Sequence, residues 1–319
     1  MLRVGMVGAG GIASTHLHHL NLNEQVELVA VCDINEDVLS AKATEYGAAP
    51  YRDVEKMLDK EKLDVLFVCV PPFAHGTIEE EAAARGIHLF VEKPVGLDMN
   101  TVKQKAKAIE ASGVLAGTGY CLRYLDTVQR LKEYIIDKTV AMVRGYYLTM
   151  FVSTPWWRDM SKSGGQLVEQ ATHIVDLMRY FAGDVEKVSA DMALCAMHDV
   201  EGLNIPDVGS VNVVFTSGAI GHMATSFTQP DHRSGVEILG RDFRAVIDGT
   251  TLSIAEGDCT TTYRSSVDFY KEQDDAFIEA VKTGNPSLIL APFKEAVKTL
   301  QITLAANESA KSGSSVWLR

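Results

Sequence analysis

The chain has 319 residues, 46% of them hydrophobic and 23% charged, and 30 basic against 42 acidic side chains give a net charge of −12. These values are typical of a globular protein of about two domains. The negative charge disfavours nucleic acid and an anionic membrane surface as partners.

The five cysteines are far apart and form no Cys-x-x-Cys pair. We therefore expect reduced thiols in a cytoplasmic protein, and neither a disulfide framework nor a zinc site. The first residues do not resemble a signal peptide, and no apolar run approaches the about 20 residues that cross a bilayer. His16, His18 and His19 have no carboxylate one turn away, so they are interpreted as ordinary helix residues without a metal.

Strand and helix patterns alternate through the first third of the chain. We predict strands at 2–7, 26–32, 65–70, 88–91 and 114–118, and helices at 11–22, 35–46, 53–58, 73–85 and 99–111. Repeated strand–helix units indicate an α/β fold with a doubly wound parallel sheet.

The pattern changes after Gly119, which predicts a first domain at 1–120 and a second at 121–319. The second domain is expected to be α+β, with one large, mainly antiparallel open sheet. Its helices are predicted at 124–136, 167–181, 268–282 and 292–312, and its strands at 140–151, 210–215, 219–227, 236–239, 244–247 and 315–318.

A glycine-rich phosphate-binding pattern follows the first strand. Gly8, Gly10 and Ala13 have the spacing G-x-G-x-x-A. Gly8 allows a tight turn, Gly10 lets a pyrophosphate approach the backbone, and the N–H groups of the new helix hold the phosphates. Asp33, at the end of the second strand, is placed to bind ribose hydroxyls and to repel a ribose phosphate, which favours NAD over NADP. The alternative is an ordinary turn, with Asp33 as a helix cap.

Two further strand ends carry candidate cofactor and substrate groups. Glu92-Lys93-Pro94 follows a parallel strand, and ligands of open α/β sheets bind outside such ends. A lysine there can hydrogen-bond a substrate oxygen, although a solvated ion pair is the alternative. Pro71-Pro72-Phe73-Ala74-His75 forms a rigid edge suited to a flat nicotinamide, or simply ends its strand.

The second domain contains two candidate substrate-contacting segments. Glu169, His173 and Asp176 share one face of a predicted helix, where a carboxylate one turn from a histidine can raise its basicity for acid–base chemistry. A structural histidine is the alternative. Trp156-Trp157-Arg158 is suited to the C–H faces and hydroxyls of a sugar, or forms a core or subunit-interface cluster.

The order of these segments resembles the Gfo/Idh/MocA family, which includes glucose-fructose oxidoreductase and inositol dehydrogenase. The resemblance runs nearly end to end, and it also includes Gly119-Tyr120-Cys121-Leu122-Arg123-Tyr124 and a closing helix at 295–311. It implies a Rossmann domain followed by an open-sheet substrate domain, a tightly held nicotinamide cofactor, and a homodimer or homotetramer formed through that sheet.

The resemblance also implies roles for individual residues. Lys93 would orient the substrate hydroxyl, His173 would be the acid–base residue, and Glu169 would orient His173. The cofactor contacts expected are Gly8, Gly10, Gly11, Ile12, Asp33, Val70, Pro71, Pro72, His75, Glu92 and Lys93. The substrate contacts expected are Lys93, Tyr120, Arg123, Trp157, Arg158, Gln166, Glu169 and His173.

Departures from the family pattern concern the substrate helix. Glu169 stands where many of the dehydrogenases have Asp, and Ala171 where they have Gly. The carboxylate of Glu169 is one methylene further from the backbone, so it is expected to reach His173 differently or to enter the substrate pocket.

The sequence therefore predicts an NAD-dependent oxidoreductase that transfers a hydride between a nicotinamide and a hydroxyl or carbonyl carbon of a sugar or polyol. One alternative is a glycosidase of the same family that uses NAD transiently. Another is a regulator that binds NAD without catalysis, against which the presence of both Lys93 and His173 argues.

Overall fold

The structure is a computed structural model that describes residues 1–318. The chain divides into two compact units. The first comprises Met1–Cys121 together with Asp268–Val297, and the second comprises Leu122–Val267 together with the described chain from Lys298 onward.

The first unit is built on a six-stranded parallel sheet in the order β3-β2-β1-β4-β5-β6. Its strands are β1 (Leu2–Val7), β2 (Val26–Cys32), β3 (Ala49–Tyr51), β4 (Val65–Val68), β5 (His88–Val91) and β6 (Ala116–Thr118). All four residues of β4 are buried, as in a central strand covered on both faces. The predicted doubly wound parallel sheet is confirmed, although the short strand β3 was not predicted.

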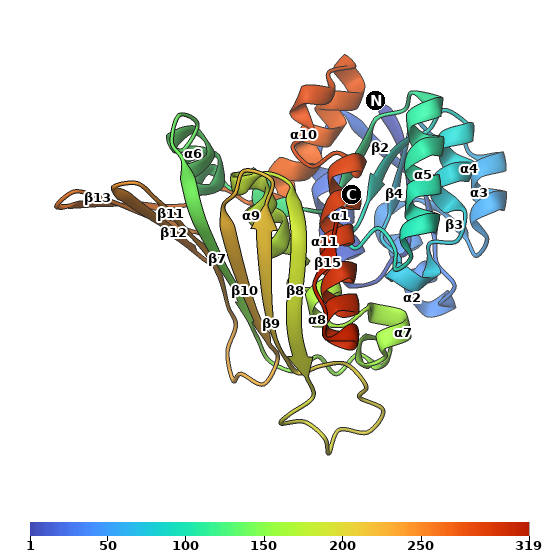
Figure 1. The fold of residues 1–319 in the computed structure, drawn as a ribbon. Helices are drawn as coiled ribbons and strands as arrows, with labels where there is room; N and C mark the ends of the chain where they lie inside the picture. Colours follow the sequence, from blue (N-terminus) through green and yellow to red (C-terminus); the bar gives the residue numbers. More distant parts are fainter. Residues whose placement is uncertain (319) are drawn as a thin grey trace. The chain divides into compact units, whose positions relative to one another are not determined.

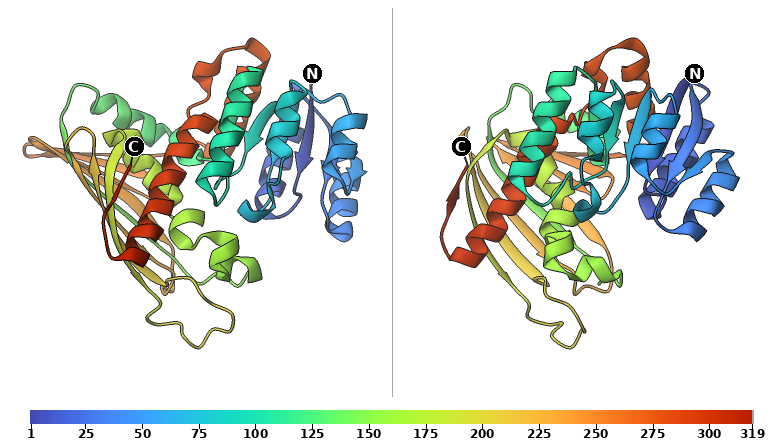
Figure 2. Two further views of the ribbon diagram at one scale, coloured as in Figure 1. Left: turned by 45° about the vertical axis from the view of Figure 1, so that its right-hand side comes forward. Right: turned by 90° about the vertical axis from the view of Figure 1, so that its right-hand side faces the viewer.

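Helices cover both faces of this sheet (Figure 1, Figure 2). They are α1 (Gly11–Leu22), α2 (Glu36–Tyr46), α3 (Val54–Lys60), α4 (Ile78–Ala84), α5 (Met99–Ser112) and α10 (Phe269–Thr283), with 3₁₀ turns η1 (Pro72–Ala74) and η4 (Pro286–Leu288). The Asn35 and Asp98 side chains cap the N-termini of α2 and α5, and Gly47 and Gly113 end these helices in the left-handed conformation. The helix expected at 73–85 is shorter, because its first residues form the separate turn η1.

Helix α10 returns from the C-terminal part of the sequence to the first unit. Its Phe277 and Ile278 are buried in the same core as Met6 and Phe67. The Phe277 and Phe67 rings meet edge to face, 5.9 Å apart between centroids. The units therefore differ from the expected division at residue 120, because the apolar face of this distant helix completes the first core.

The second unit is built on a nine-stranded sheet in the order β14-β13-β12-β11-β7-β10-β9-β8-β15. Its strands are β7 (Val140–Leu148), β8 (Val185–Ala193), β9 (Val208–Phe215), β10 (Ile220–Ser226), β11 (Arg233–Gly240), β12 (Phe243–Asp248), β13 (Thr251–Glu256), β14 (Cys259–Arg264) and β15 (Val316–Trp317). Neighbouring strands are antiparallel except β7 and β10. The predicted large, mainly antiparallel sheet is confirmed.

Helices α9 (Thr172–Ala182) and α11 (Phe293–Ser312) lie on one face of this sheet, and the other face carries no helix in the described chain (Figure 1, Figure 2). The contact with α9 is close, since a Cβ on Gly145 of β7 would lie 2.7 Å from the Ile174 side chain. The shorter helical segments are η2 (Cys121–Tyr124), α6 (Asp126–Tyr134), η3 (Pro155–Arg158), α7 (Met160–Ser163) and α8 (Gln166–Glu169). Within residues 1–318, we find no helix with the length and apolar character of a membrane span.

The helix expected at 167–181 is interrupted. It forms α8 and α9, which are separated at Gln170 and Ala171. The N–H of Ala171 donates to the carbonyl of Gln166, five residues back, and the N–H of His173 donates to Gln170, three residues back. Glu169 and His173 therefore lie on two successive helical segments and not on one continuous helix.

Candidate functional site

The glycine loop joins β1 to α1 in the first unit. Gly8 has φ +83°, and a Cβ there would lie 2.5 Å from the carbonyl oxygen of Cys69, so glycine is required. A Cβ on Gly10 or Gly11 would meet no atom within 4 Å, so the space beside the loop is open. Helix α1 has no side-chain cap and no acidic residue in its first turn. Its first N–H groups and its positive dipole end therefore suit a diphosphate.

Asp33 lies after β2 and faces the glycine loop. Its Oδ2 accepts the N–H of Ala9 at 2.7 Å, and its Oδ1 accepts the N–H of Asn35 at 2.8 Å. The cap of α2 is Asn35, whose side chain accepts two N–H groups of that helix, and not Asp33. Each carboxylate oxygen of Asp33 has a further lone pair, so ribose hydroxyls can still donate to it.

The segment after β4 ends in a buried ion cluster. The Nδ1 of His75 bonds to Glu79, and the Nζ of Lys105 lies 2.5 Å from Glu79 Oε2 and 2.5 Å from the carbonyl oxygen of Gly76. Burial raises the pKa of Glu79, but His75 and Lys105 outweigh it and hold that pKa below its usual value. The Nε2 of His75 is buried and has no hydrogen-bond partner within residues 1–318, so it has capacity for a ligand. The preceding Val70 and Pro71 are partly exposed, and Pro72 is buried.

Glu92 and Lys93 follow β5 at the carboxyl edge of the sheet. Glu92 is 4% exposed, and its Oε2 accepts the backbone N–H of Lys93 at 3.0 Å. The Nε2 of His16 lies 3.1 Å from the other oxygen of Glu92. Glu92 is therefore a buried, bonded carboxylate and not the solvated ion pair that was the alternative. Tyr120, expected to contact substrate, is buried directly after β6.

In the second unit, α8 brings Gln166 and Glu169 to the start of α9. Gly164 and Gly165 have φ +73° and +84°, which sets the sharp entry into α8. Gln166 is 3% exposed, and its amide donates to the carbonyl of Ser226 at 2.9 Å. The Oε2 of Glu169 accepts the indole N–H of Trp157 at 2.8 Å. Glu169 and His173 are both partly exposed, so either can be reached by a ligand.

Trp157 and Arg158 belong to the aromatic segment that was expected to contact a sugar. Trp157 is 1% exposed and packs edge to face on Phe227, with 4.9 Å between ring centroids. Its ring is therefore a core element that positions Glu169 through the indole N–H. The guanidinium of Arg158 stacks over the ring of Phe151 at 5.3 Å and donates to the carbonyl of Ser153.

Arg123, another expected substrate contact, is 3% exposed and forms a forked ion pair with Asp176. Its Nε and Nη2 each lie 2.7 Å from a carboxylate oxygen. Thr299 on α11 also donates to Asp176 at 2.9 Å. This geometry makes Arg123 and Asp176 a buried structural pair that joins η2, α9 and α11.

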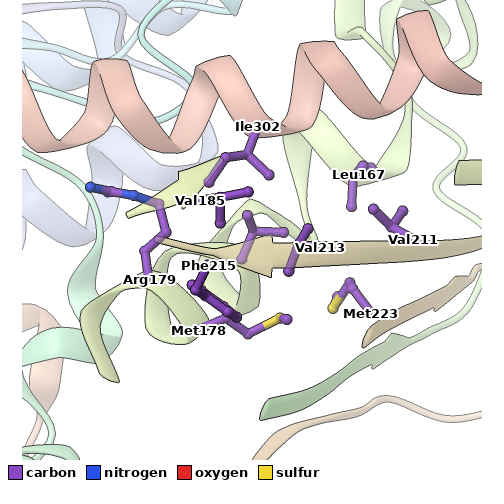
Figure 3. A pocket seen from close by; sticks show the side chains of 10 residues that line it. Leu167, Met178, Arg179, Val185, Val211, Val213, Phe215, Met223 and Ile302 are labelled. Atoms are coloured by element: carbon purple, nitrogen blue, oxygen red, sulfur yellow. The ribbon is translucent and has the colours of Figure 1, made fainter. Parts of the chain in front are cut away.

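An apolar hollow lies under α9 and α11 in the second unit (Figure 3). It has room for about one water-sized sphere, and apolar side chains such as Met178, Phe215 and Ile302 surround it. The guanidinium of Arg179 points away from these side chains (Figure 3) and donates to Thr299 and Asp184. This hollow is a packing gap and not a substrate pocket.

The structure identifies one cluster that the sequence did not predict. His16 pairs with Asp274 and Glu92, which are 258 and 76 residues away along the chain, so no local spacing could show it. The contact of His75 with Glu79 could have been predicted, since the two are four residues apart. Within residues 1–318, no three His, Cys, Asp or Glu side chains are arranged to hold a metal ion.

Comparison with known proteins agrees with this fold. A family model described as an oxidoreductase family with an NAD-binding Rossmann fold matches residues 2–120, and a Gfo/Idh/MocA C-terminal domain model matches residues 136–255. The myo-inositol 2-dehydrogenase of Thermotoga maritima is 25% identical over 331 residues, which cover 99% of this chain and 98% of the relative.

Two solved structures are also similar. GenD2 from gentamicin A biosynthesis, in complex with NAD, is 26% identical, has a TM-score of 0.87, and the match covers 100% of this chain and 96% of that one. The WlbA dehydrogenase of Bordetella pertussis, in complex with NADH and UDP-GlcNAcA, shares the fold with a TM-score of 0.87 at 23% identity, covering 100% and 99% of the two chains. The chain therefore belongs to the Gfo/Idh/MocA family of oxidoreductases, and its residues 2–120 match the NAD-binding Rossmann domain of that family.

Proposed function

We propose that the protein is an NAD-dependent dehydrogenase or reductase that exchanges a hydride with a hydroxyl or carbonyl carbon of a sugar or polyol. One observation carries the cofactor half of the proposal: α1 begins at an open glycine loop with no side-chain cap, and Asp33 is bonded to that loop. The relative named as a myo-inositol 2-dehydrogenase supports the substrate class.

The acid–base chemistry is assigned to groups of this chain. His173 takes the proton of the substrate hydroxyl, and Lys93 donates a hydrogen bond to the developing alkoxide. Glu169, itself held by the indole N–H of Trp157, orients His173. NAD, when bound, supplies the hydride acceptor.

We propose that NAD is used in preference to NADP because Asp33 is an acidic group at the edge of the glycine loop. Its charge repels a ribose phosphate, while its free lone pairs accept from ribose hydroxyls. We also assign cofactor contacts to the remaining loop residues, Gly10, Gly11 and Ile12, and to His75, whose buried Nε2 has capacity for a hydrogen bond.

The substrate is proposed to contact Lys93, Tyr120, Arg158, Gln166, Glu169 and His173. Arg123 and Trp157 are assigned a supporting role, since Arg123 pairs with Asp176 and the indole N–H of Trp157 donates to Glu169. Gln166 stays among the contacts because its buried amide oxygen has no hydrogen-bond partner within residues 1–318.

We further propose a homodimer or homotetramer formed through the helix-free face of the large sheet. Met142 and Ile220 pair across β7 and β10, and both side chains are exposed, at 37% and 51%. Exposed apolar side chains on an uncovered sheet are typical of a subunit interface. The free thiols of all five cysteines are compatible with a cytoplasmic location.

The test is NADH formation by the purified protein with NAD and a panel of inositols, aldoses and other polyols, with NADP in parallel. We expect activity with NAD, loss of turnover in Lys93→Ala with NAD binding retained, and normal turnover in the control Lys103→Ala, which changes an exposed lysine of α5. Full activity of Lys93→Ala would refute the assignment. Release of a glycoside leaving group without net NADH would instead indicate the NAD-using glycosidase.

A further inference from the structure

Three ionisable side chains from distant parts of the sequence meet inside the first unit. The Nδ1 of His16 on α1 lies 2.9 and 2.8 Å from the two carboxylate oxygens of Asp274 on α10. The Nε2 of His16 lies 3.1 Å from Oε1 of Glu92 at the end of β5. The three residues are 0%, 1% and 4% exposed. An imidazolium donates from both nitrogens, so a charged His16 satisfies both carboxylates at once.

The surroundings hold the His16 ring in one orientation. The rings of Phe67 and Phe90 lie 5.5 and 5.2 Å from it between centroids. Burial lowers the pKa of His16, but the charges and hydrogen bonds of Asp274 and Glu92 outweigh it and raise the pKa to about 10. The other charged or titratable groups around the cluster are His19 with Asp268, Tyr270, Cys69, Cys121 and Lys93.

Glu92 connects His16 to the backbone of Lys93. Its Oε1 faces the imidazole, and its Oε2 accepts the Lys93 N–H at 3.0 Å. The backbone of Gly119 closes the remaining side, because a Cβ there would lie 2.2 Å from Oε1. The carboxylate therefore has little freedom to move while His16 and the Lys93 amide are both bonded to it.

His16 lies on α1, the helix that follows the glycine loop. Helix α1 begins at Gly11, next to the open space proposed for the cofactor diphosphate, and His16 is in its second turn. A single imidazole thus joins the phosphate-binding helix, the strand end that bears Lys93, and α10. We propose that His16 is a positioning residue that sets the location of Lys93 relative to the cofactor site, with Asp274 as the anchor that holds the imidazole. This inference rests on the proposed function, in which Lys93 acts on the substrate.

Two substitutions at one position separate the two bonds of His16. In His16→Gln the amide nitrogen reaches about as far as Nε2, so the bond to Glu92 can be kept while the bond to Asp274 is lost. In His16→Asn the amide nitrogen reaches only about as far as Nδ1, so the bond to Asp274 can be kept while Glu92 is released. Asp275→Asn is the matched control, since Asp275 is the next residue of α10 and is a partly exposed partner of Lys271.

We expect the kcat of the His16→Asn variant to be about 10- to 100-fold below that of the parent protein, because Lys93 is displaced from its productive position. His16→Gln should retain at least about tenfold more kcat than His16→Asn, even if it melts at a lower temperature. The NAD dissociation constant should change little in either variant, and Asp275→Asn should match the parent protein. Equal kcat in the two His16 variants, or loss of activity that simply follows melting temperature, would overturn the proposal.

An NMR measurement tests the positioning without turnover. The backbone amide resonance of Lys93 should move in His16→Asn and stay near its parent position in His16→Gln, because only the first variant releases the Glu92 carboxylate. An unmoved Lys93 amide in His16→Asn would refute the proposal. If His16→Asn does not fold, the amide of Lys93 in His16→Phe gives the second test, because phenylalanine keeps a ring beside Phe67 and Phe90 but donates no hydrogen bond to Glu92. An unmoved amide there has the same meaning. A parent protein inactive on every substrate refutes the proposed function instead, and the amide measurement still decides the role of His16.

Discussion

The pH dependence of stability gives a direct test of the buried imidazolium. His16 has a raised pKa of about 10 in the folded protein against 6.5 for an ordinary histidine, mainly because Asp274 and Glu92 outweigh the effect of burial. A group whose folded pKa is raised contributes stability that is complete below the unfolded pKa and is lost as pH rises through the folded pKa. The change Asp274→Asn is therefore most informative over about two pH units, roughly pH 7.5 to 9.5, which lie between the unfolded and folded pKa values of His16.

The magnitude follows from proton counting. In this window the folded protein keeps one proton on His16 that the unfolded chain has released, so the free energy of unfolding falls by about 1.4 kcal/mol per pH unit. Removing one partner of a buried ion pair costs about 3–5 kcal/mol. At neutral pH, Asp274→Asn should therefore lie about 3–5 kcal/mol below the parent protein, and the gap should shrink by about 3 kcal/mol over two pH units.

The assay is urea unfolding of both proteins at a series of pH values, followed by circular dichroism. Comparing the two proteins removes the titration of the other lysine, tyrosine and cysteine side chains that they share. Asp275→Asn serves as control, since its carboxylate does not contact His16. A gap between parent and Asp274→Asn that is constant with pH would refute a protonated His16.

Three further substitutions test other parts of the structure. Arg123→Leu leaves the buried Asp176 carboxylate without the guanidinium that pairs with it, so the free energy of unfolding in urea should fall by about 3–5 kcal/mol. A fall below about 1 kcal/mol, as for an exposed ion pair, would contradict a buried structural role. Gly8→Ala forces a side chain into a left-handed conformation, which costs about 1–3 kcal/mol, and calorimetry should show weakened NAD binding; unchanged binding would argue against the loop as the phosphate site. Trp157→Phe keeps an aromatic ring in the core but removes the N–H that donates to Glu169. The free energy of unfolding should fall by about 1 kcal/mol, and the pH profile of kcat should shift. An unshifted profile would show that Glu169 has no part in the acid–base step.

The local elements could be predicted from the sequence because short-range physics determines them. The strand Leu2–Val7 and the helix Gly11–Leu22 have the predicted bounds, since an apolar run followed by glycine and then by helical spacing admits few other structures. The same holds for the helix end at Gly47, where a left-handed residue is needed. Short strands such as Ala49–Tyr51 were not predicted, because three residues carry no usable periodicity.

Individual residues of the candidate site could be proposed from the sequence only where they belong to a short sequence motif. The glycine loop, Asp33 and Lys93 follow from patterns whose residues are close in sequence. Arg123 could not be assigned in this way, because an arginine can donate hydrogen bonds to a sugar as well as to a carboxylate. Only the fold shows that its partner is Asp176.

The sequence by itself determined the α/β class and the nucleotide-binding loop, because each depends on residues within a few turns of one another. The acid–base groups that it suggests remain a prediction. The tertiary structure alone decided that α10 belongs to the first unit and that His16 is held between Asp274 and Glu92. The physical reason is that a buried charge is stable only beside opposite charges, and these can come from residues far away in the sequence. Here the packing of Phe277 on Phe67 places α10, and with it Asp274, against the first sheet.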